Sequence, residues 1–514
     1  MIAMHRDGAN KSLWQDAMPV YLPKHKIVPE KIVDVLIVGG GITGLSTALE
    51  LQKAGKQCLL IEACTIGFGT TGGTTAHLNT FLDTPYDQIE KDFGENNAQL
   101  VFKATSEAIA SIKKNIEEYN IDCGFSYKDG YVYSQNAKQS EALDKTVEAS
   151  KKAGLSIDYT NEIPVPIPFE KAAKFSRQAQ FHASKYLYGL AEAYENAGGH
   201  IVQNCKLESF ESNGLAEAKT NLGVIRARKM IFATHIPPGI NLLHFRNAPY
   251  RSYALAVKLA DGKYPDALVY DLHDPYHYFR TQEVNGIKYL IAGGEDHKTG
   301  HNENTDFCFS KLDSYLSKYY DIDEVSFKWS SEYFEPSDGL PYIGHLPGFT
   351  DNVFVATGFS GNGMTYSHVA ARLLTDLLTT GNSEYKDLFS PNRIKPVAGF
   401  TNFIKENADV VKEFIGKRMS KEKIESLVEI AKGEGKVVKY EGESIALYRD
   451  ERGSLHAVNP VCTHAKCIVQ WNTSEKSWDC PCHGARYTAD GKVITGPASK
   501  DLEIIELKDL VKVE

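Results

Sequence analysis

The sequence contains no long uninterrupted hydrophobic run. Its most apolar long stretch, from Asp34 to Leu51, is broken by four glycines, two threonines and a serine, so it is too polar for a membrane-spanning helix. Residues 1–31 mix charged residues with prolines and lack the basic-then-apolar order of a secretory signal. We therefore expect neither a membrane span nor secretion.

Concentrated positive charge is also absent. The formal net charge is −9, the pI is near 6.0, and no cluster of lysines and arginines resembles a polybasic membrane anchor. Nucleic-acid-binding surfaces are basic, so we expect no nucleic-acid partner. A hydrophobic fraction of 42% and a charged fraction of 24% are ordinary for a globular protein. A chain of 514 residues is long enough for two or three domains.

Cysteines are few, nine in 514 residues. Five of them follow no spacing typical of a disulfide framework, and we expect most of these to be reduced thiols in the core. They are Cys58, Cys64, Cys123, Cys205 and Cys308. This use of cysteine predicts a cytoplasmic protein.

The remaining four cysteines lie near the end of the chain, in two motifs. The first motif is Cys462-Thr463-His464, and a second cysteine, the spare Cys467, follows it. The second motif is Cys480-Pro481-Cys482-His483. A Rieske [2Fe–2S] cluster has two cysteines on one iron and two histidines on the other. This predicts Cys462 and Cys480 as ligands of one iron, and His464 and His483 as ligands of the other. A structural zinc site also takes two cysteines and two histidines, so these four residues alone leave both metals open.

This stretch resembles the Rieske proteins of respiratory complexes, in which the spare cysteines of the two loops form a disulfide. The resemblance implies a bond between Cys467 and Cys482, which a zinc site does not need, and it therefore favours the cluster. Ala485 stands where the family often has a serine that donates a hydrogen bond to a cluster sulfur, whereas Tyr487 matches the second donor. Fewer donors stabilise the reduced cluster less, so we expect a lower potential than in the respiratory proteins.

The front of the chain carries a dinucleotide-binding pattern. A buried strand is predicted at Val33–Val38, and it leads into the G-x-G-x-x-G of residues 39–44 and a helix from about Ile42 to Ala54. A second strand, Gln57–Ile61, ends at Glu62, which is placed to bind ribose hydroxyls. The glycines allow a tight turn and a pyrophosphate at the helix N-terminus. A lone glycine motif is weak evidence, but here all the parts occur in order.

Three later segments indicate FAD rather than NAD. Residues 67–76 form a polar loop of small residues that could run beneath a flavin, and residues 230–235 form a strand with a polar exit. Residues 352–364 form a strand and a glycine-rich turn before a helix, whose N-terminus could stabilise a negative flavin edge. The predicted FAD contacts are Gly39, Gly41, Ile42, Thr43, Gly44, Glu62, Gly69, Thr70, Thr71, Thr74, Ala233, Thr234, Gly358, Gly361, Asn362, Gly363 and Met364.

With these motifs the chain resembles the D-amino acid oxidase superfamily, which includes glycine and sarcosine oxidases. Residues 181–183 and 338–344 also match, and the resemblance runs from about Val33 to Arg393. It implies an α/β, Rossmann-like FAD-binding domain interleaved with an α+β substrate domain built on a mixed, largely antiparallel sheet. The C-terminal match implies a small all-β Rieske domain.

This organisation predicts four parts. They are an N-terminal arm (1–30), an FAD-dependent oxidoreductase (31–400), a charged helical linker (401–423) and a Rieske domain (424–514). Periodicity predicts further helices at 95–119, 140–153, 187–197 and 365–378. Strands of the substrate domain are predicted at 124–133, 253–259, 276–280 and 289–292, and strands of the Rieske domain at 435–440, 443–449 and 455–458.

The substrate pocket departs from the superfamily pattern. Oxidases of amino acids in it often use an arginine just before the motif at residues 338–344 to bind the substrate carboxylate, but residues 329–338 contain none. A simple amino acid is therefore in doubt, and Glu332 or Glu335 could favour a cationic amine. The pocket candidates are Arg251, Tyr253, Tyr278, Arg280, Glu295, Tyr333 and Glu335. His273 and His277 have metal-ligand spacing for a helix, but Pro275 disfavours a helix there.

We expect an FAD-dependent amine or amino-acid-like dehydrogenase in which hydride passes from substrate to flavin N5. Electrons would then leave singly through the Rieske cluster to an unknown redox protein or quinone, because a flavin accepts two electrons and the cluster one. The Rieske resemblance implies that His464 and His483 lie at exposed loop tips, where the electrons would leave.

Three alternatives stay open. A Rieske oxygenase would need a mononuclear iron site, yet no histidine-rich helix follows the cluster motif. An NADH-dependent reductase would need a second dinucleotide motif, and none is found. A redox-sensing or assembly flavoprotein without turnover would explain the missing arginine.

Overall fold

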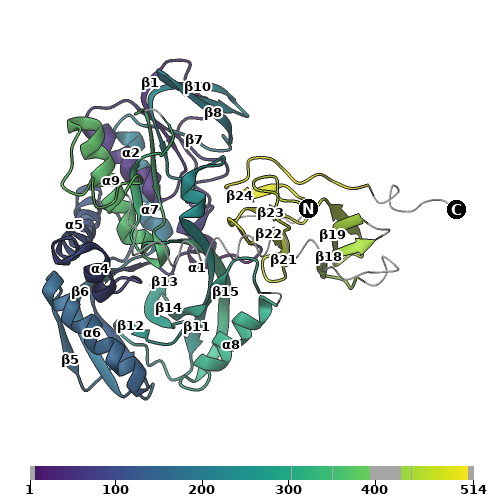
Figure 1. The fold of residues 1–514 in the computed structure, drawn as a ribbon. Helices are drawn as coiled ribbons and strands as arrows, with labels where there is room; N and C mark the ends of the chain where they lie inside the picture. The colour runs from purple at the N-terminus through teal and green to yellow at the C-terminus, as the bar shows by residue number, and fades with distance from the viewer. Residues whose placement is uncertain (1–5, 303, 350, 394–429, 441–442, 507–514) are drawn as a thin grey trace.

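The computed structural model describes residues 6–302, 304–349, 351–393, 430–440 and 443–506. A large body contains the described residues up to 393, and a small C-terminal domain lies against one side of it (Figure 1). Among the described helices, none has both the length and the apolar character needed to cross a membrane. The predicted linker, residues 401–423, lies outside the described residues.

The first sheet of the large body has the order β16-β17-β10-β1-β2-β7, and the neighbours from β17 to β7 are parallel. β16 pairs with β17 antiparallel, and the β8–β9 hairpin extends β10. The strands are β1 (Val33–Val38), β2 (Cys58–Ile61), β7 (His200–Val202), β8 (Leu207–Asn213), β9 (Leu215–Thr220), β10 (Gly223–Phe232), β16 (Tyr342–His345) and β17 (Val353–Thr357).

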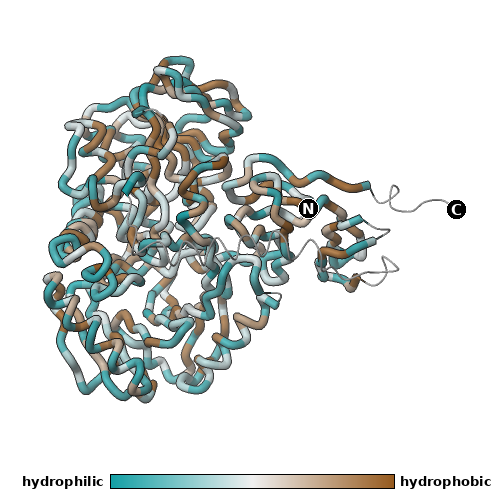
Figure 2. The backbone as a smooth tube through the Cα atoms, viewed as in Figure 1, coloured by the Kyte–Doolittle hydropathy of each residue, from teal (hydrophilic) through white to brown (hydrophobic). Residues whose placement is uncertain are grey.

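The central strands of this sheet are apolar because both of its faces are covered. Leu36 and Ile37 of β1 are fully buried in two different core clusters, one on each side of the sheet. Apolar residues accordingly colour the interior of this region in Figure 2. The helices packed on it are α2 (Ile42–Lys53), α7 (Ala183–Asn196) and α9 (Gly363–Thr380), and α5 (Glu95–Tyr119) packs on α9 and α7.

The second sheet has the order β15-β11-β14-β13-β12-β4-β6-β3, with β5 beside β6. Only the β12–β4 pair is parallel among its described pairs, which confirms a mixed, largely antiparallel sheet. The strands are β3 (His77–Leu78), β4 (Ser126–Ser134), β5 (Ile157–Thr160), β6 (Lys171–Gln180), β11 (Asn247–Leu259), β12 (Leu268–Asp271), β13 (Tyr278–Val284), β14 (Ile287–Lys298) and β15 (Ile322–Pro336). The helices beside it are α4 (Tyr86–Phe93), α6 (Ala137–Ala153) and α8 (Asp306–Leu316).

The two faces of the β11–β15 edge have different neighbours. One face packs on α8 and, further along, on the small domain, as Tyr253 on Phe309 and Arg251 beside Asp479 show. The opposite face turns toward the loop of residues 67–76, where Trp329 donates to the Gly73 carbonyl. Since side chains alternate along a strand, neighbouring residues of β11 and β15 serve different sites. We call these the outer face and the flavin face.

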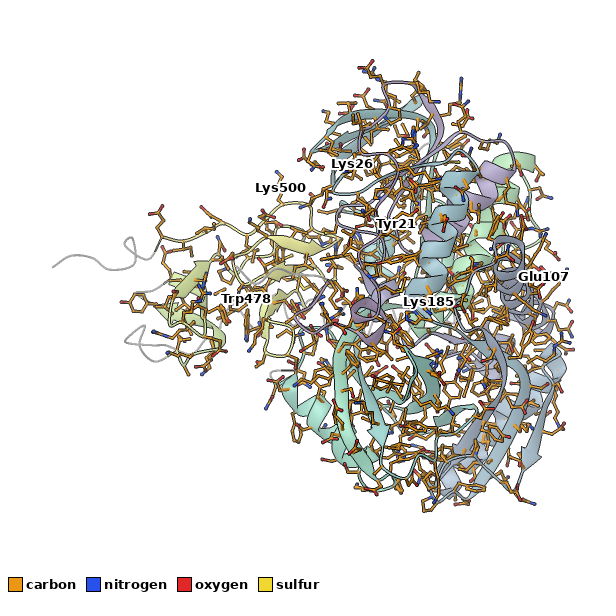
Figure 3. The ribbon with its side chains drawn as sticks, turned by 180° about the vertical axis from the view of Figure 1, so that it is seen from behind. Tyr21, Lys26, Glu107, Lys185, Trp478 and Lys500 are labelled. Carbon is orange, nitrogen blue, oxygen red and sulfur yellow. A yellow bond between two sulfur atoms is a disulfide. The ribbon has the colours of Figure 1, made fainter. Side chains whose placement is uncertain are left out.

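The small domain is all β, as the sequence predicts. Its two antiparallel sheets are β18-β19-β20 and β21-β22-β23-β24, and the buried Trp478 lies inside it (Figure 3). The strands are β18 (Gly435–Tyr440), β19 (Glu443–Arg449), β20 (Leu455–Val458), β21 (Gln470–Asn472), β22 (Ser477–Asp479), β23 (Arg486–Thr488) and β24 (Val493–Thr495). The part of the chain that the structure describes also has four short helices, α1 (Leu13–Asp16), α3 (Thr70–Gly73), η1 (Leu242–Phe245) and η2 (Ser360–Asn362).

Candidate flavin and cluster sites

The turn between β1 and α2 can accept a pyrophosphate. Gly39 has φ +115°, and a Cβ at Gly44 would lie 1.9 Å from the Gly39 carbonyl oxygen, so neither position tolerates a side chain. The turn leads into the N-terminus of α2, where the N-cap, Gly41, has no side chain to cap the helix. Backbone N–H groups at a helix N-terminus are well suited to bind phosphate.

Glu62 closes the turn from the end of β2. Its carboxylate accepts hydrogen bonds from the backbone N–H groups of Gly40 (2.7 Å) and Cys64 (2.8 Å). Burial raises the pKa of Glu62, and these hydrogen bonds act in the opposite direction. An acid at this place fits the ribose-binding role that the sequence predicts.

Three further segments meet at this turn. Thr71 of α3 accepts a hydrogen bond from the Ile42 backbone N–H at 3.1 Å, and a Cβ at Gly39 would lie 2.4 Å from the Ala233 carbonyl oxygen. On the other side, the Asn362 side chain accepts from the Asp83 backbone N–H at 2.9 Å, just before α9 begins. A Cβ at Gly69 would meet nothing within 4 Å, so the residue that precedes α3 leaves room beside the loop.

The flavin face carries a connected set of acids and tyrosines. The Tyr333 hydroxyl donates to Asp296 at 2.9 Å, and the Ser252 and Tyr278 hydroxyls are 3.0 Å apart. Burial raises the pKa of Asp296 to about 7, while its hydrogen bonds to Ser252 and Tyr333 lower it. Of these residues, only Tyr278 and Tyr333 are among the predicted pocket candidates.

Asp83 connects this set to the glycine-rich turn of residues 358–362, just before α9. It accepts from the Gly361 backbone N–H at 2.5 Å and from the Tyr276 hydroxyl at 3.4 Å. The Asp83 side chain is exposed, so solvent limits any rise in its pKa. This makes Asp296 the stronger case for an unusual carboxyl. We call Asp83, Ser252, Tyr276, Tyr278, Asp296 and Tyr333 the flavin-face cluster.

Arg280 is fully buried but holds the loop rather than a substrate. Its Nη1 donates to the carbonyl oxygens of Thr75 (2.9 Å) and Ala76 (2.6 Å), and its guanidinium lies over the Trp14 ring at 5.4 Å. Burial lowers the pKa of Arg280 to about 9. Its donors fix residues 75–76 beside the flavin-face cluster, which differs from the predicted pocket role.

Three predicted pocket residues lie on the outer face instead. Tyr253 is buried under α8 and bonds to His297 at 2.9 Å, while Glu295 lies 3.4 Å from Lys311 of α8. Arg251 lies 3.7 Å from Asp479 of the small domain. The prediction placed them wrongly because strand alternation sends their side chains away from the flavin face.

The remaining predictions for this region have mixed outcomes. Glu335 is two residues from Tyr333 in β15, and its charge helps to raise the pKa of that tyrosine. Glu332, the other acid proposed for an amine, faces the small domain, and burial raises its pKa to about 8. His277 bonds to Asp271 at 2.7 Å and stacks on Tyr315. His273 lies in an irregular segment after β12, so no helical metal pair forms there.

The two cysteine loops of the small domain meet as predicted. Cys467 and Cys482 form a disulfide with a Cα–Cα distance of 6.4 Å. The sulfurs of Cys467, Cys480 and Cys482 lie within 4.8 Å of one another, but the disulfide uses two of them. Cys480 is a free thiol, as is Cys462, whose sulfur lies 3.2 Å from the Tyr487 hydroxyl.

The two histidines complete a set that fits a [2Fe–2S] cluster. The His464 and His483 rings are 5.0 Å apart at 87°. The Nδ1 atoms of both are buried and have no hydrogen-bond partner among the described residues. Two thiols and two open imidazole nitrogens are the donors that the two irons of a Rieske centre require.

The sequence-based expectation that these histidines lie at exposed loop tips is wrong. His464 is 9% exposed and His483 is 3% exposed, because the segment around η1 covers them. His464 Nε2 bonds to the Gly239 carbonyl oxygen at 3.1 Å, and the His244 ring lies 4.6 Å from the His464 ring. The histidine side of the cluster loops is therefore docked on the large body.

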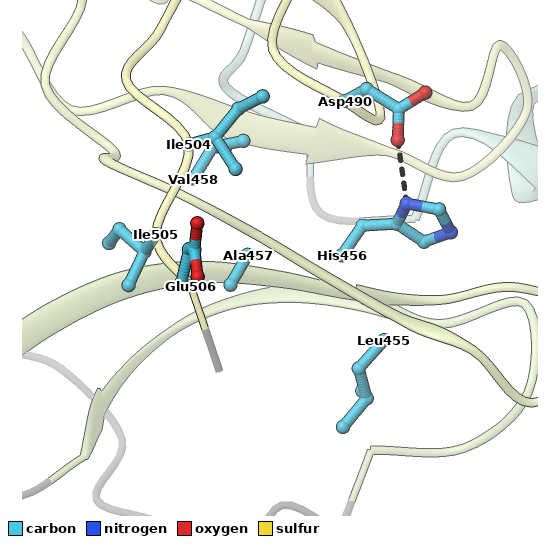
Figure 4. Close-up of a pocket in the computed structure, with 8 residues that line it drawn as sticks. All are labelled: Leu455, His456, Ala457, Val458, Asp490, Ile504, Ile505 and Glu506. Atoms are coloured by element: carbon cyan, nitrogen blue, oxygen red, sulfur yellow. Dashed lines mark ion pairs between the residues drawn. The ribbon is translucent and has the colours of Figure 1, made fainter. Parts of the chain in front are cut away.

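The small domain has a surface groove that is lined by neither the flavin segments nor the cluster ligands. It is an apolar groove of about 350 Å³ on the small domain, where His456 pairs with Asp490 at 2.6 Å (Figure 4). Its lining residues are Leu455, His456, Ala457, Val458, Asp490, Ile504, Ile505 and Glu506. None of them belongs to the predicted cofactor or substrate sites.

Comparison with known proteins identifies the two domains. Residues 34–377 match the family described as FAD dependent oxidoreductase (DAO), and residues 421–506 match the Rieske [2Fe-2S] domain. The chain belongs to the DAO family of FAD-dependent oxidoreductases. It binds FAD and, through its C-terminal domain, a [2Fe–2S] cluster.

One relative matches almost the whole chain, and two others match only about 70% of it. The chain is 36% identical to YhfW of Bacillus subtilis (strain 168), described as a Rieske 2Fe-2S iron-sulfur protein, over 92% of this chain and 93% of that one. It is 26% identical to gamma-glutamylputrescine oxidoreductase of Escherichia coli (strain K12), over 72% and 89% respectively. The crystal structure of glycine oxidase from Geobacillus kaustophilus aligns with a TM-score of 0.59 and 18% identity, over 70% of this chain and 99% of that chain. At that identity, the likeness shows the fold alone.

Proposed function

We propose that this DAO-family oxidoreductase dehydrogenates a cationic amine and passes the electrons singly through its Rieske cluster to a separate acceptor. The observation that carries the amine assignment is the Asp296–Tyr333 pair on the flavin face. When bound, FAD supplies a two-electron hydride acceptor at N5, and the cluster supplies a one-electron carrier.

The residues proposed to hold the cofactors are those of the two sites. We assign Cys462, Cys480, His464 and His483 to the irons, and Tyr487 as a hydrogen-bond donor to the Cys462 sulfur. The glycine turn of residues 39–44, Glu62 and the loop of residues 67–76 would hold the FAD, together with residues 233–234 and 358–364.

The chemistry of the flavin-face cluster supports a positively charged substrate. A carboxylate surrounded by tyrosine rings attracts an ammonium group by charge and by cation–π contact. Arg280, in the same sheet, already donates to backbone carbonyls, so it is poorly placed to bind a substrate carboxylate. The similarity to gamma-glutamylputrescine oxidoreductase, which is named for an amine, points the same way.

The docked cluster supports internal electron transfer. A Cβ at Gly484, next to His483, would lie 3.1 Å from Phe334. The Phe334 ring lies 4.7 Å from that of His235, and His235 Nδ1 lies 3.2 Å from the Thr70 hydroxyl of the flavin loop. Close contacts thus connect the cluster loop to the flavin loop, and electron transfer is faster over shorter distances.

The final acceptor would be a one-electron redox protein or a quinone. A cytoplasmic location fits the free thiols of Cys58, Cys64, Cys123, Cys205 and Cys308, which form no disulfide among the described residues.

An anaerobic substrate screen tests this function. Primary amines and diamines should bleach the flavin absorbance and then reduce the cluster, whereas glycine and simple D- or L-amino acids should react far more slowly. Faster bleaching by simple amino acids than by any amine would contradict the amine assignment.

A further inference from the structure

The N-terminal segment, residues 6–16, lies between the two redox domains, and about half of its residues are buried. Arg6 and Asp7 are each 1% exposed, and Ser12 and Trp14 are fully buried. Burying charged side chains is costly unless each finds partners. These charged residues therefore need specific contacts, and they find them on both sides.

One set of contacts is with the loop proposed to hold the flavin. The Ser12 hydroxyl donates to the Gly72 carbonyl at 2.5 Å, and Trp14 Nε1 donates to the Thr74 carbonyl at 2.6 Å. Gln15 Nε2 donates to the Gly67 carbonyl at 3.0 Å, and the Asp7 backbone N–H donates to the Phe68 carbonyl at 3.2 Å. Four carbonyls of one loop are thus held by one short segment.

The other set is with the Rieske domain. Arg6 Nη1 lies 3.3 Å from Glu475, and the Ala9 backbone N–H donates to the same carboxylate at 2.8 Å. Asn10 Nδ2 donates to the Ser474 carbonyl at 3.0 Å. Arg486 of β23 donates to the Asp7 carbonyl. The segment therefore contacts the turn between β21 and β22 as well as β23.

Arg6 also joins both domains to the outer face of the second sheet. Its Nη2 donates to the Ser330 carbonyl at 2.5 Å, and the Ser330 backbone N–H donates to Glu475 at 3.0 Å. Arg6 and Glu475 thus hold the same residue of β15 from two sides. Arg6 also pairs with Asp7 at 2.7 Å, whereas losing Arg6 would leave Glu475 as a buried carboxylate without its ion-pair partner.

We propose that residues 6–16 form a clasp that fixes the Rieske domain against the flavin loop, with Arg6 as its central positioning residue. This inference rests on the electron route proposed above. A flexible attachment would let the distance between the two cofactors vary, whereas the clasp holds the loop and the domain in one geometry. The clasp would therefore set the rate at which electrons cross from flavin to cluster.

The test compares Arg6→Ala with Lys11→Ala in the full-length protein loaded with both cofactors. Lys11 is a matched control because its ion pair with Asp16 is about half exposed, at 47% and 49%. The docking of the Rieske domain is measured by the rate of backbone hydrogen exchange in peptides that cover residues 326–334 and 472–479. Photoreduction of the flavin by a deazaflavin then reports transfer to the cluster, without any substrate.

For Arg6→Ala we expect about tenfold faster exchange in both peptides, as the loss of charged hydrogen bonds implies. We also expect slower cluster reduction, with FAD content and flavin photoreduction unchanged. Lys11→Ala should match the parent protein in all readouts. Unchanged exchange, or faster exchange with undiminished transfer, would overturn the clasp.

Two outcomes separate the clasp from the function on which it rests. If the parent protein shows no flavin-to-cluster transfer, the electron route fails, and exchange alone decides whether the segment docks the domain. If Arg6→Ala does not fold, Asn10→Ala removes a single hydrogen bond to Ser474 and is judged by the same two readouts.

Discussion

At the residue scale, the proposed substrate side contains two carboxyls, Asp296 and Asp83, that form no ion pair among the described residues. Asp296 and Asp83 bond to tyrosines, serine and backbone N–H groups. Burial therefore dominates at Asp296, and the pKa of that carboxyl rises. Such groups are often functional, because a charged ligand can supply the missing counter-ion. A protonated amine is the simplest ligand of this kind.

Replacing Asp296 tests this directly. Asp296→Asn keeps the shape but removes the negative charge, so the KM for an amine substrate should rise by about 10- to 100-fold, the worth of a charge-assisted hydrogen bond. Steady-state kinetics measure this. Glu295→Gln is the matched control. Glu295 is the next residue in β14, but its side chain faces Lys311 on the outer face. Equal effects of the two substitutions would count against the assignment.

The same carboxyl predicts a pH dependence. With its pKa near 7, Asp296 is largely neutral at pH 6 and largely ionised at pH 8. Amine affinity should therefore increase as the pH rises from about 6 to about 8, while the amine itself stays protonated. Binding titrations of the oxidised protein with an unreactive tertiary amine can follow this, and in Asp296→Asn the dependence should flatten.

Tyr487 gives a prediction for the cluster. Its hydroxyl lies 3.2 Å from the Cys462 sulfur and, as a donor, would stabilise the reduced cluster. Tyr487→Phe should lower the potential by about 20–60 mV, which corresponds to one ordinary hydrogen bond. An EPR-monitored redox titration measures this change. Ala485→Ser should act in the opposite direction, and an unchanged potential in both variants would refute the role of these donors.

At the element scale, periodicity and glycine patterns predicted the fold well, because they are local. The strands β1 and β2, the glycine turn and α5 occur where the sequence places them. The helix predicted at residues 187–197 begins earlier, at Ala183, since the His182 side chain caps it by accepting from the Lys185 backbone N–H. The strand predicted at residues 276–280 begins at Tyr278, because Asp271 holds the preceding turn through the His273 and His277 N–H groups.

Which face a strand residue uses was harder to predict. The pocket candidates came from segments that flank the flavin, but β11 and β14 alternate between two buried faces. Bulges such as the one between Arg251 and Tyr253 also shift the register. Asp83 and Tyr276 were missed because they lie in loops brought together only by the tertiary fold.

The disulfide gives a prediction for the cluster loops. Cys467 and Cys482 join the loop that carries Cys462 and His464 to the loop that carries Cys480 and His483. Replacing both with serine should accelerate cluster loss on mild heating, with FAD content unchanged. Visible absorbance of the cluster, compared with flavin fluorescence, measures both. Equal cluster lifetimes with and without the disulfide would show that it does not support the loops.

At the scale of the whole molecule, the docking of the two domains is the feature that the sequence could not reveal. No local pattern connects Arg6 with Glu475, or Gly239 with His464, because such contacts depend on the assembled surfaces of both domains. We expected electrons to leave the cluster past His464 and His483. Because both are buried against the large body, the proposed route would instead bring electrons in past these histidines. The resemblance to exposed Rieske loops therefore predicted the ligands but not their surroundings.

The central claim is that electrons run from an amine to the flavin and then to the cluster, and rapid anaerobic mixing with an amine tests it most directly. The flavin absorbance should bleach first, and the cluster signal should follow at a slower, concentration-independent rate. In Cys480→Ser, which lacks a proposed cluster ligand, bleaching should persist and the second phase should vanish. The claim would be contradicted if the cluster stayed oxidised after the flavin bleached, or if NADH reduced it before any amine did.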